Sequence, residues 1–289
     1  MEKIRPERRS TLAQDPVEAP SIDEVLSEPE NGALETASSA GASGLASVGE
    51  EPLGVEDPSL LPCDVVGFSS VVSARPNLKP QARLVALDAQ DPAGAEFAVL
   101  AARLNRLKSQ GPLKRVLVAA CKAGGGGSLV CANLALTLAQ NPTHKVLLLD
   151  GDLEQPCLTE RFGLPATEGF AEYLQGTEPL EALVRYLSPG GIWFLPAGKP
   201  PHDPENRLRL LRSRRLPNLL GRELDWFDWV IVDSPPLETR VTAGAFMQFC
   251  EGLLIVIRKG HTTKKLLRRT LDMLDGAPVL GYALNEMEA

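Results

Sequence analysis

The sequence predicts a doubly wound α/β fold, with a mainly parallel sheet covered by helices on both faces and a disordered tail in front of it. Short apolar strands alternate with helical stretches along most of the chain, as they do in parallel sheets. Runs such as VLLLD (146–150) and WVIVD (229–233) are apolar on both faces, which is typical of strands buried under two helix layers. We expect strands at residues 116–120, 146–150, 192–196, 229–233, 253–258 and 279–285.

Composition divides the chain into residues 1–82 and residues 83–289. The first part is rich in Pro, Glu, Ser, Gly and Ala, has Phe68 as its one aromatic residue and shows no sustained periodicity. A segment of this kind cannot bury enough apolar surface to fold, so we expect a disordered tail. The apolar stretch from Leu60 to Val72 fits either a docking patch or an adhesive linker, and we assign it no function.

A helix is expected just before the first of the main strands. Asp91 provides a cap and Pro92 suits the first helical position. Apolar residues then recur at spacings of three and four and form one stripe, which ends before Gly111. The stripe consists of Phe97, Leu100, Leu104 and Leu107.

Several classes of protein are excluded by composition. The five cysteines are scattered without a CxxC pair, which indicates neither a disulfide framework nor a zinc site and favours a reducing compartment. No apolar run approaches the roughly 18 residues of a membrane span, and the charged start is unlike a secretion signal. We therefore expect a cytoplasmic protein. A net charge of -7 argues against attraction to nucleic acid over the whole surface.

A glycine loop follows the first main strand. It runs from Cys121 through Lys122 and four successive glycines, Gly124, Gly125, Gly126 and Gly127, to Ser128, and a helical stretch comes next. Glycines allow backbone N–H groups to curl around a phosphate, and a helix N-terminus favours an anion. Taken alone, the loop fits a phosphate cradle and a flexible turn equally well.

Three carboxylates are expected at the same edge of the sheet as this loop. Asp150 and Asp152 end one strand, and Asp233 ends another. Ligands of open α/β sheets bind at the carboxyl ends of the strands. Three acidic residues beside a glycine loop suit Mg²⁺ and phosphate. The combination favours the phosphate-cradle interpretation.

These motifs resemble the MinD/ParA-type deviant P-loop ATPases, and most closely the bacterial tyrosine kinases of capsule and exopolysaccharide export. KVLLLDGDLEQPCLTERFGL is similar to the family's second Walker A motif, WVIVDSPPL to its Walker B motif and PAGKPPHDPE to the loop between them. The resemblance covers about residues 83–288. It implies ATP or ADP with Mg²⁺, phosphates on the glycine loop, Ser128 as a magnesium ligand, Asp150 as the base or water-orienting carboxylate, and Asp152 and Asp233 around the metal.

The loop departs from the family at its central residue. Gly127 stands where the family has the lysine that bridges the β- and γ-phosphates. Losing one such contact typically lowers the rate roughly 10²- to 10³-fold. Lys122 matches the signature lysine of MinD/ParA proteins at the front of the loop. It either substitutes in part for the missing charge or points to solvent.

Further departures concern tyrosines and arginines. The family's tyrosine cluster does not follow the last strand; Tyr173 and Tyr186 are expected in helical stretches and Tyr282 inside a strand. The helix at residues 96–103 resembles the family's ring-forming segment with alanines in place of arginines, which predicts weakened self-association. Glu154 and Gln155 likewise replace family arginines.

Three functions remain open on these residues. The first is a degenerate, nucleotide-binding or scaffold relative of the polysaccharide tyrosine kinases, which would dock on a membrane co-polymerase or chain-length regulator and so be peripheral to the membrane. The alternative is an active ATP-dependent protein tyrosine kinase of exopolysaccharide synthesis, and the third is a ParA- or MinD-like positioning ATPase. The missing lysine favours the first, and the retained serine and aspartates favour the second.

Overall fold

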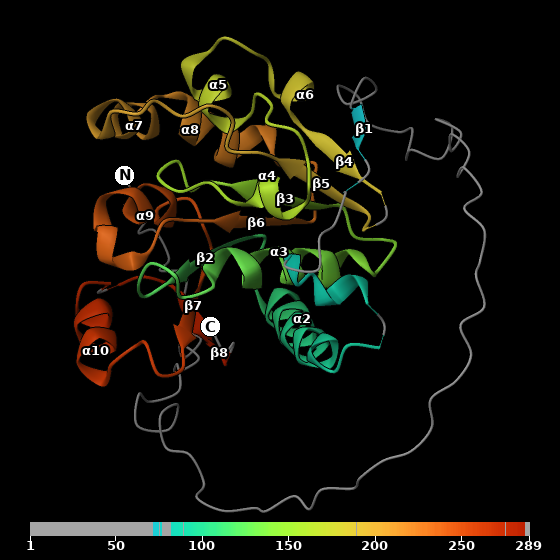
Figure 1. The fold of residues 1–289 in the computed structure, drawn as a ribbon, viewed down its shortest axis with the longest axis vertical. Coiled ribbons are helices and arrows are strands. Elements are labelled where there is room, and N and C mark those ends of the chain that lie inside the picture. Colours follow the sequence, from blue (N-terminus) through green and yellow to red (C-terminus); the bar gives the residue numbers. More distant parts are fainter. Residues whose placement is uncertain are drawn as a thin grey trace, which may run out of the picture.

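A single sheet organises the part of the chain that the computed structural model describes, namely residues 72–74, 76, 82–88, 90–188, 190–274 and 276–286. Within these residues the sheet has eight strands, in the order β1-β4-β5-β3-β6-β2-β7-β8 (Figure 1). All neighbouring strands are parallel except β4 and β5, which are antiparallel. The predicted α/β fold with a mainly parallel sheet is therefore confirmed.

The strands agree closely with the sequence prediction, with two additions. The six predicted strands are found within one residue of their expected limits, whereas β1 and the short strand β4 were not expected. The prediction that Tyr186 lies in a helical stretch is wrong, because it is the middle residue of β4. The strands are β1 (Val72–Ala74), β2 (Arg115–Ala120), β3 (Val146–Asp150), β4 (Arg185–Leu187), β5 (Ile192–Leu195), β6 (Trp229–Asp233), β7 (Gly252–Arg258) and β8 (Val279–Asn285).

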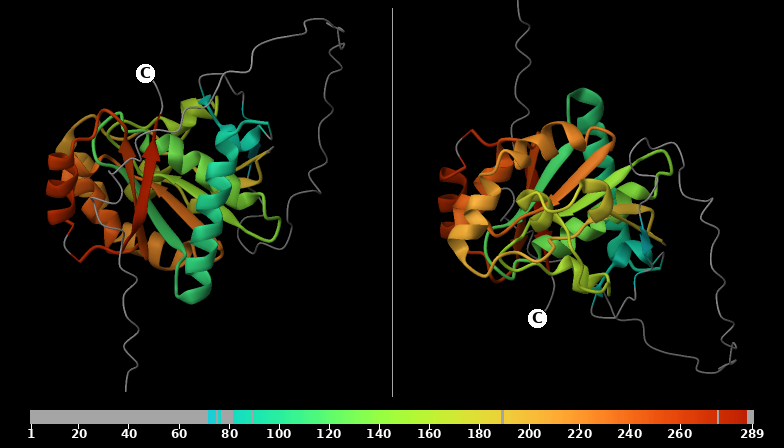
Figure 2. Two further views of the ribbon diagram at one scale, coloured as in Figure 1. Left: turned by 90° about the horizontal axis from the view of Figure 1, so that it is seen from below. Right: turned by 90° about the horizontal axis from the view of Figure 1, so that it is seen from above.

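Helices cover both faces of the sheet (Figure 2). One face packs on α2, α3 and α4, and the other on α5 to α10, so that each face has its own apolar cluster. No helix of the described residues has the length and apolar character needed to cross a bilayer. The helices are α2 (Ala93–Gln110), α3 (Gly127–Ala139), α4 (Leu158–Arg161), α5 (Phe170–Gln175), α6 (Leu180–Leu183), α7 (Pro204–Leu211), α8 (Arg215–Asn218), α9 (Arg240–Met247) and α10 (Lys264–Asp272).

The strand residues are buried because they alternate between these two clusters. In β3, Leu147 and Leu149 belong to one cluster, while Val146 and Leu148 belong to the other. Helix α3, which follows the glycine loop, lies almost wholly in the core, since most of its residues from Gly127 to Leu138 are buried. This burial fixes the helix, and therefore its N-terminus, against the sheet.

The helix expected before β2 is α2. A side-chain oxygen of Asp91 accepts a hydrogen bond from the backbone N–H of Ala93 at 2.9 Å, as a capping aspartate does. Leu104 is buried on the sheet side, whereas Val99 is 50% exposed on the opposite side. The helix resembling the ring-forming segment therefore presents its small side chains, among them Ala98 and Ala102, at the surface.

The region near the predicted boundary at residue 83 is tied to the domain. Asn133 of α3 donates to the carbonyl of Arg83 at 3.1 Å and accepts from the N–H of Ala86 at 3.1 Å. Strand β1 lies within the stretch assigned to the tail and pairs with β4. The expectations for residues 1–71, including most of the 60–72 apolar stretch, fall outside the described residues.

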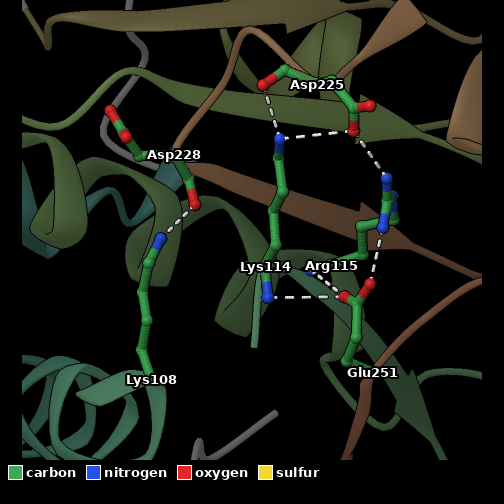
Figure 3. A network of polar contacts seen from close by, with 6 residues as sticks. All are labelled: Lys108, Lys114, Arg115, Asp225, Asp228 and Glu251. Carbon is green, nitrogen blue, oxygen red and sulfur yellow. Dashed lines mark hydrogen bonds and ion pairs between the residues drawn. The ribbon is translucent and has the colours of Figure 1, made fainter. Parts of the chain in front are cut away.

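Ion pairs hold the rim of the sheet opposite to the predicted site (Figure 3). Arg115 at the start of β2 bonds Glu251 at 2.5 Å and Asp225 at 2.9 Å. The second oxygen of Glu251 accepts the backbone N–H of Arg115 at 2.6 Å. Lys108 of α2 donates to the carbonyl of Asp228, just before β6. These contacts join the amino ends of β2, β6 and β7.

We predict that Glu251→Ala lowers the free energy of unfolding by about 2 kcal/mol. The substitution removes the carboxylate that accepts from both the guanidinium and the backbone N–H of Arg115, and the Arg115 side chain is only 12% exposed. Urea denaturation measures the change. The control is Lys199→Ala, whose 3.7 Å ion pair is exposed and should contribute less than about 0.5 kcal/mol. Equal losses in the two variants would contradict a special role for Glu251.

Candidate functional site

The candidate site is built from the carboxyl ends of three adjacent strands. Strand β6 lies between β2 and β3, so that the loop after β2 and the acidic ends of β3 and β6 meet at one edge. Asp150 and Asp233 are register partners, and the N–H of Gly151 donates to the carbonyl of Asp233 at 3.0 Å. The structure therefore brings together the glycine loop and the aspartates that the sequence predicts.

Asp150 and Asp233 are both completely buried beneath α3. One oxygen of Asp150 accepts the N–H of Leu158 at 3.3 Å, but its other oxygen and both oxygens of Asp233 are buried without a hydrogen-bond partner in the described residues. Burial, and next the charge of Asp233, raise the pKa of Asp150 well above its usual value. Burial raises the pKa of Asp233 to about 7, although the Ser128 hydroxyl opposes the shift.

Asp152 differs from this pair. One of its oxygens accepts the backbone N–H groups of Glu154 and Gln155, each at 2.9 Å, so that the carboxylate shapes its own turn. Burial raises its pKa, and these two hydrogen bonds oppose that shift. Glu154, which replaces a family arginine, accepts a hydrogen bond from Thr242 of α9 at 3.0 Å. Glu154 therefore links the turn after β3 to α9.

The glycine loop needs its glycines at two positions above all. A Cβ on Gly125 would lie 2.7 Å from the Cβ of Ala120, and Gly126 adopts a φ of +88°. Helix α3 begins at Gly127, directly after this left-handed residue. The N–H groups of Gly126, Gly127 and Ser128 have no hydrogen-bond partner among the described residues. They form a donor set of the kind that binds phosphate at a helix N-terminus.

The described residues fit a bound nucleotide with Mg²⁺ in two respects. Free N–H donors match phosphate oxygens, and the unpartnered oxygens of Asp150 and Asp233 match a cation or its water shell. No cluster of three or more His, Cys, Asp or Glu residues in the described ranges could hold a metal by itself. A cation would therefore need Ser128 and the phosphates as further ligands, so the assignment of Ser128, Asp152 and Asp233 to a metal stays a prediction.

Position 127, where the resemblance predicts a lysine, is tight in this chain. A Cβ on Gly127 would lie 3.2 Å from the backbone nitrogen and 3.5 Å from the Cβ of Ala120. The φ of Gly127 is not in the left-handed region, so a lysine there is allowed by its backbone but requires the end of β2 to move by a few tenths of an ångström. Gly127 therefore allows α3 to start close against β2.

Lys122 lies exposed at the front of the loop. No hydrogen bond or ion pair of its side chain is found in the described part of the chain. Ala123, the next residue, donates its N–H to the carboxylate of Glu238 at 2.9 Å. Glu238 follows β6 and was not identified from the sequence. Its contact fixes the front of the loop beside Lys122.

Two more residues at the loop escaped the sequence analysis. Arg258 donates to the carbonyl of Gly124 at 2.9 Å, and Asn285 donates to the carbonyl of Gly125 at 3.0 Å. Both residues end strands, but the contacts span 134 and 160 positions of sequence. No local pattern marks such a contact, although the strand ends themselves could be located from the sequence.

Cys157 and Arg161 also border the aspartate pair. Burial raises the pKa of the Cys157 thiol, and a hydrogen bond with Ser128 opposes the shift. The charge of Arg161 lowers the pKa of Asp233, less strongly than Ser128 does. Arg161 also donates to the carbonyl of Ala82 at 2.9 Å, which links the site to the start of the domain.

We predict that Asp233→Asn stabilises the protein at alkaline pH when Mg²⁺ and nucleotide are absent. The folded state holds this proton up to about pH 7, whereas the unfolded chain releases it near 3.8, so the free energy of unfolding falls as the pH rises between these values. The variant avoids this loss and should gain roughly 2 to 4 kcal/mol by pH 8 and almost nothing at pH 4.

Urea denaturation in EDTA between pH 4 and pH 8 measures this difference. Asp203→Asn serves as the control for loss of one carboxylate, since Asp203 is exposed and asparagine keeps an acceptor for the N–H of Asn206. A variant that shows the same pH dependence as the unmodified protein would refute the buried, protonated state of Asp233.

The chain is similar to known tyrosine kinases and transport proteins of bacteria. It is 33% identical over 195 residues to the tyrosine-protein kinase ptk of Acinetobacter johnsonii, an alignment that covers 66% of this chain and 25% of that protein. It is 31% identical over 175 residues to the succinoglycan biosynthesis transport protein ExoP of Rhizobium meliloti, covering 60% and 22%. The chain thus matches about a quarter of the length of each of these two relatives. No protein-family model matches it.

The fold is also found in a solved kinase domain. The kinase domain of VpsO has a TM-score of 0.61 and 28% sequence identity, and the match covers 67% of this chain and 96% of that domain. Almost the whole of that domain is therefore represented here.

Proposed function

We propose that the chain carries a kinase domain of the bacterial tyrosine-kinase type, in the MinD/ParA-like group of P-loop ATPases, and that it is an ATP-dependent protein tyrosine kinase of exopolysaccharide synthesis. Its similarity to a tyrosine-protein kinase, a succinoglycan transport protein and a solved kinase domain supports this proposal. One observation carries this proposal. The unpartnered oxygens of Asp150 and Asp233 lie at the same sheet edge as the free N–H groups of the glycine loop. That arrangement suits a nucleotide and Mg²⁺ bound together.

Each side chain has a defined part in this proposal. The N–H groups of Gly126, Gly127 and Ser128 hold phosphate oxygens, with Gly124 and Gly125 shaping the loop. Ser128 and Asp233 hold Mg²⁺, directly or through water, with Asp152 behind them. A bound Mg²⁺ supplies the positive charge that phosphoryl transfer needs.

Asp150 is the proposed base. It accepts the proton of the attacking tyrosine hydroxyl, whose oxygen forms the new bond to the γ-phosphorus as the bond to the ADP oxygen breaks. In the absence of a cation, burial and next the charge of Asp233 raise the pKa of Asp150, which favours its protonated form. With a cation held nearby by Ser128 and Asp233, the ionised form of Asp150 would be favoured, and Asp150 could then accept the proton.

The names of the relatives favour the active kinase over the scaffold interpretation. The Acinetobacter protein is named a tyrosine-protein kinase, and ExoP is named for succinoglycan biosynthesis and transport. By analogy, we place this domain on the inner face of the membrane, acting with a membrane chain-length regulator. We further propose that the domain self-associates. Lys122 would then serve as an additional positive charge near the phosphates.

A second function, nucleotide binding without phosphoryl transfer, is favoured by Gly127. The position lacks the lysine, and a Cβ there would require the end of β2 to move by a few tenths of an ångström. In this case the bound nucleotide would regulate docking on the membrane partner. The two functions share one site and differ in turnover.

We expect the full chain to bind Mg·ATP and Mg·ADP by calorimetry and to transfer phosphate from ATP to the tyrosines of a Glu-Tyr copolymer. Asp233→Ala should abolish magnesium-dependent binding, since it removes a proposed ligand. Asp150→Asn should retain binding and lose transfer at least about tenfold, since it removes only the base. Binding without any transfer would favour the regulatory function, and absence of binding would refute both.

The lysine position offers a separate test. We predict that Gly127→Lys raises ATP turnover at least about tenfold, because it restores the cation between the β- and γ-phosphates. Gly127→Met is the matched control, since its Cβ meets the same crowding at Ala120 without a charge. Equal turnover in the two variants would show that loss of the lysine is not what limits this chain.

A further inference from the structure

The outer side of the glycine loop is held by the last two strands. Arg258 is the final residue of β7, and its Nη1 donates to the carbonyl of Gly124 at 2.9 Å. Asn285 is its register partner at the end of β8, and its Nδ2 donates to the carbonyl of Gly125 at 3.0 Å. Two successive carbonyl groups of the loop are therefore bound to neighbouring strand ends.

Both donors are themselves fixed. Asn285 is 9% exposed, and its carbonyl accepts the N–H of Lys259 at 3.0 Å. The N–H of Arg258 donates to Thr262 at 3.3 Å. A Cβ on Gly126 would lie 2.0 Å from the Nδ2 of Asn285, so the close approach of this amide depends on glycine there.

These contacts orient the N–H groups that would meet phosphate. The C=O and N–H of a trans peptide group point in opposite directions. Because Asn285 holds the carbonyl of Gly125 outward, the N–H of Gly126 points away from β8 and stays free. Because Arg258 holds the carbonyl of Gly124, the N–H of Gly125 closes a turn onto the carbonyl of Lys122 at 3.1 Å.

Arg258 also places a permanent positive charge next to the loop. A guanidinium stays protonated in proteins, and no carboxylate pairs with Arg258 in the described residues. Its Nε is buried without a hydrogen-bond partner there. Such a charge attracts the polyphosphate end of a nucleotide more strongly than its nucleoside end.

We propose that Arg258 and Asn285 are positioning residues that take over part of the work of the missing lysine. Asn285 fixes the loop with its N–H groups turned inward, and Arg258 both fixes the loop and supplies positive charge from outside it. This inference rests on the proposed nucleotide site. On this inference, residues of β7 and β8, rather than of α3, make the site prefer nucleoside di- and triphosphates over monophosphates.

Calorimetry on the full chain tests the charge. Arg258→Gln should weaken Mg·ADP binding about tenfold and AMP binding less than about threefold, whereas Arg258→Lys should restore ADP binding to within about threefold. Arg209→Gln removes an exposed arginine of α7 and controls for net charge. Unchanged ADP binding, or equal weakening for ADP and AMP, overturns the charge role.

Hydrogen exchange without nucleotide tests the positioning. Asn285→Ala should speed exchange of the hydrogen-bonded amides of Gly125 and Val130 about tenfold and leave those of β3 unchanged, because the Gly125 carbonyl loses its donor and the loop loosens. Uniformly faster exchange, or no change in the loop, overturns the positioning role. If the unmodified protein binds no nucleotide, the proposed function and the charge role fail together, while the exchange rates still decide the positioning role.

Discussion

Burial of two carboxylates at neighbouring strand ends governs the site. Asp150 and Asp233 face the same helix at the same level of the sheet, away from water, and three of their four oxygens lack partners among the described residues. Ionisation of both carboxyl groups is unfavourable unless a positive charge binds close to them. The Ser128 hydroxyl and Arg161 favour the ionised form of Asp233 only in part. A cation would complete the compensation.

The opposite rim of the sheet has a complementary construction. There Arg115, Glu251 and Asp225 form satisfied ion pairs that join the amino ends of β2, β6 and β7. The central strands are thus secured at the end where no ligand is expected. The carboxyl ends of these strands can then carry polar atoms without hydrogen-bond partners. The strands stay paired there because the ion pairs at their amino ends already fix their register. Stability and function are divided between the two ends of the same strands.

Much of this arrangement could be predicted from sequence because its signals are local. Six strands are continuous apolar runs, and the glycine loop and the aspartates directly follow such runs. Strand β4 was missed because three residues, one of them Arg185, give no periodicity. Arg258 and Asn285 were missed as loop contacts because their partners lie far away in sequence. The crowding at Gly127 likewise depends on β2 and could not be inferred from the loop alone.

A ligand at the buried carboxylate pair would also affect how long the protein survives in a cell. A ligand that binds the folded chain but not the unfolded one adds about 2.7 kcal/mol of stability at a hundredfold excess over its Kd. Proteases act on the transiently unfolded fraction, so a shift of this size changes abundance several-fold. If the proposed site binds nucleotide, the domain with an empty site would therefore be degraded faster than the loaded one. Its cellular concentration would follow the supply of magnesium and nucleotide, before any phosphate is transferred.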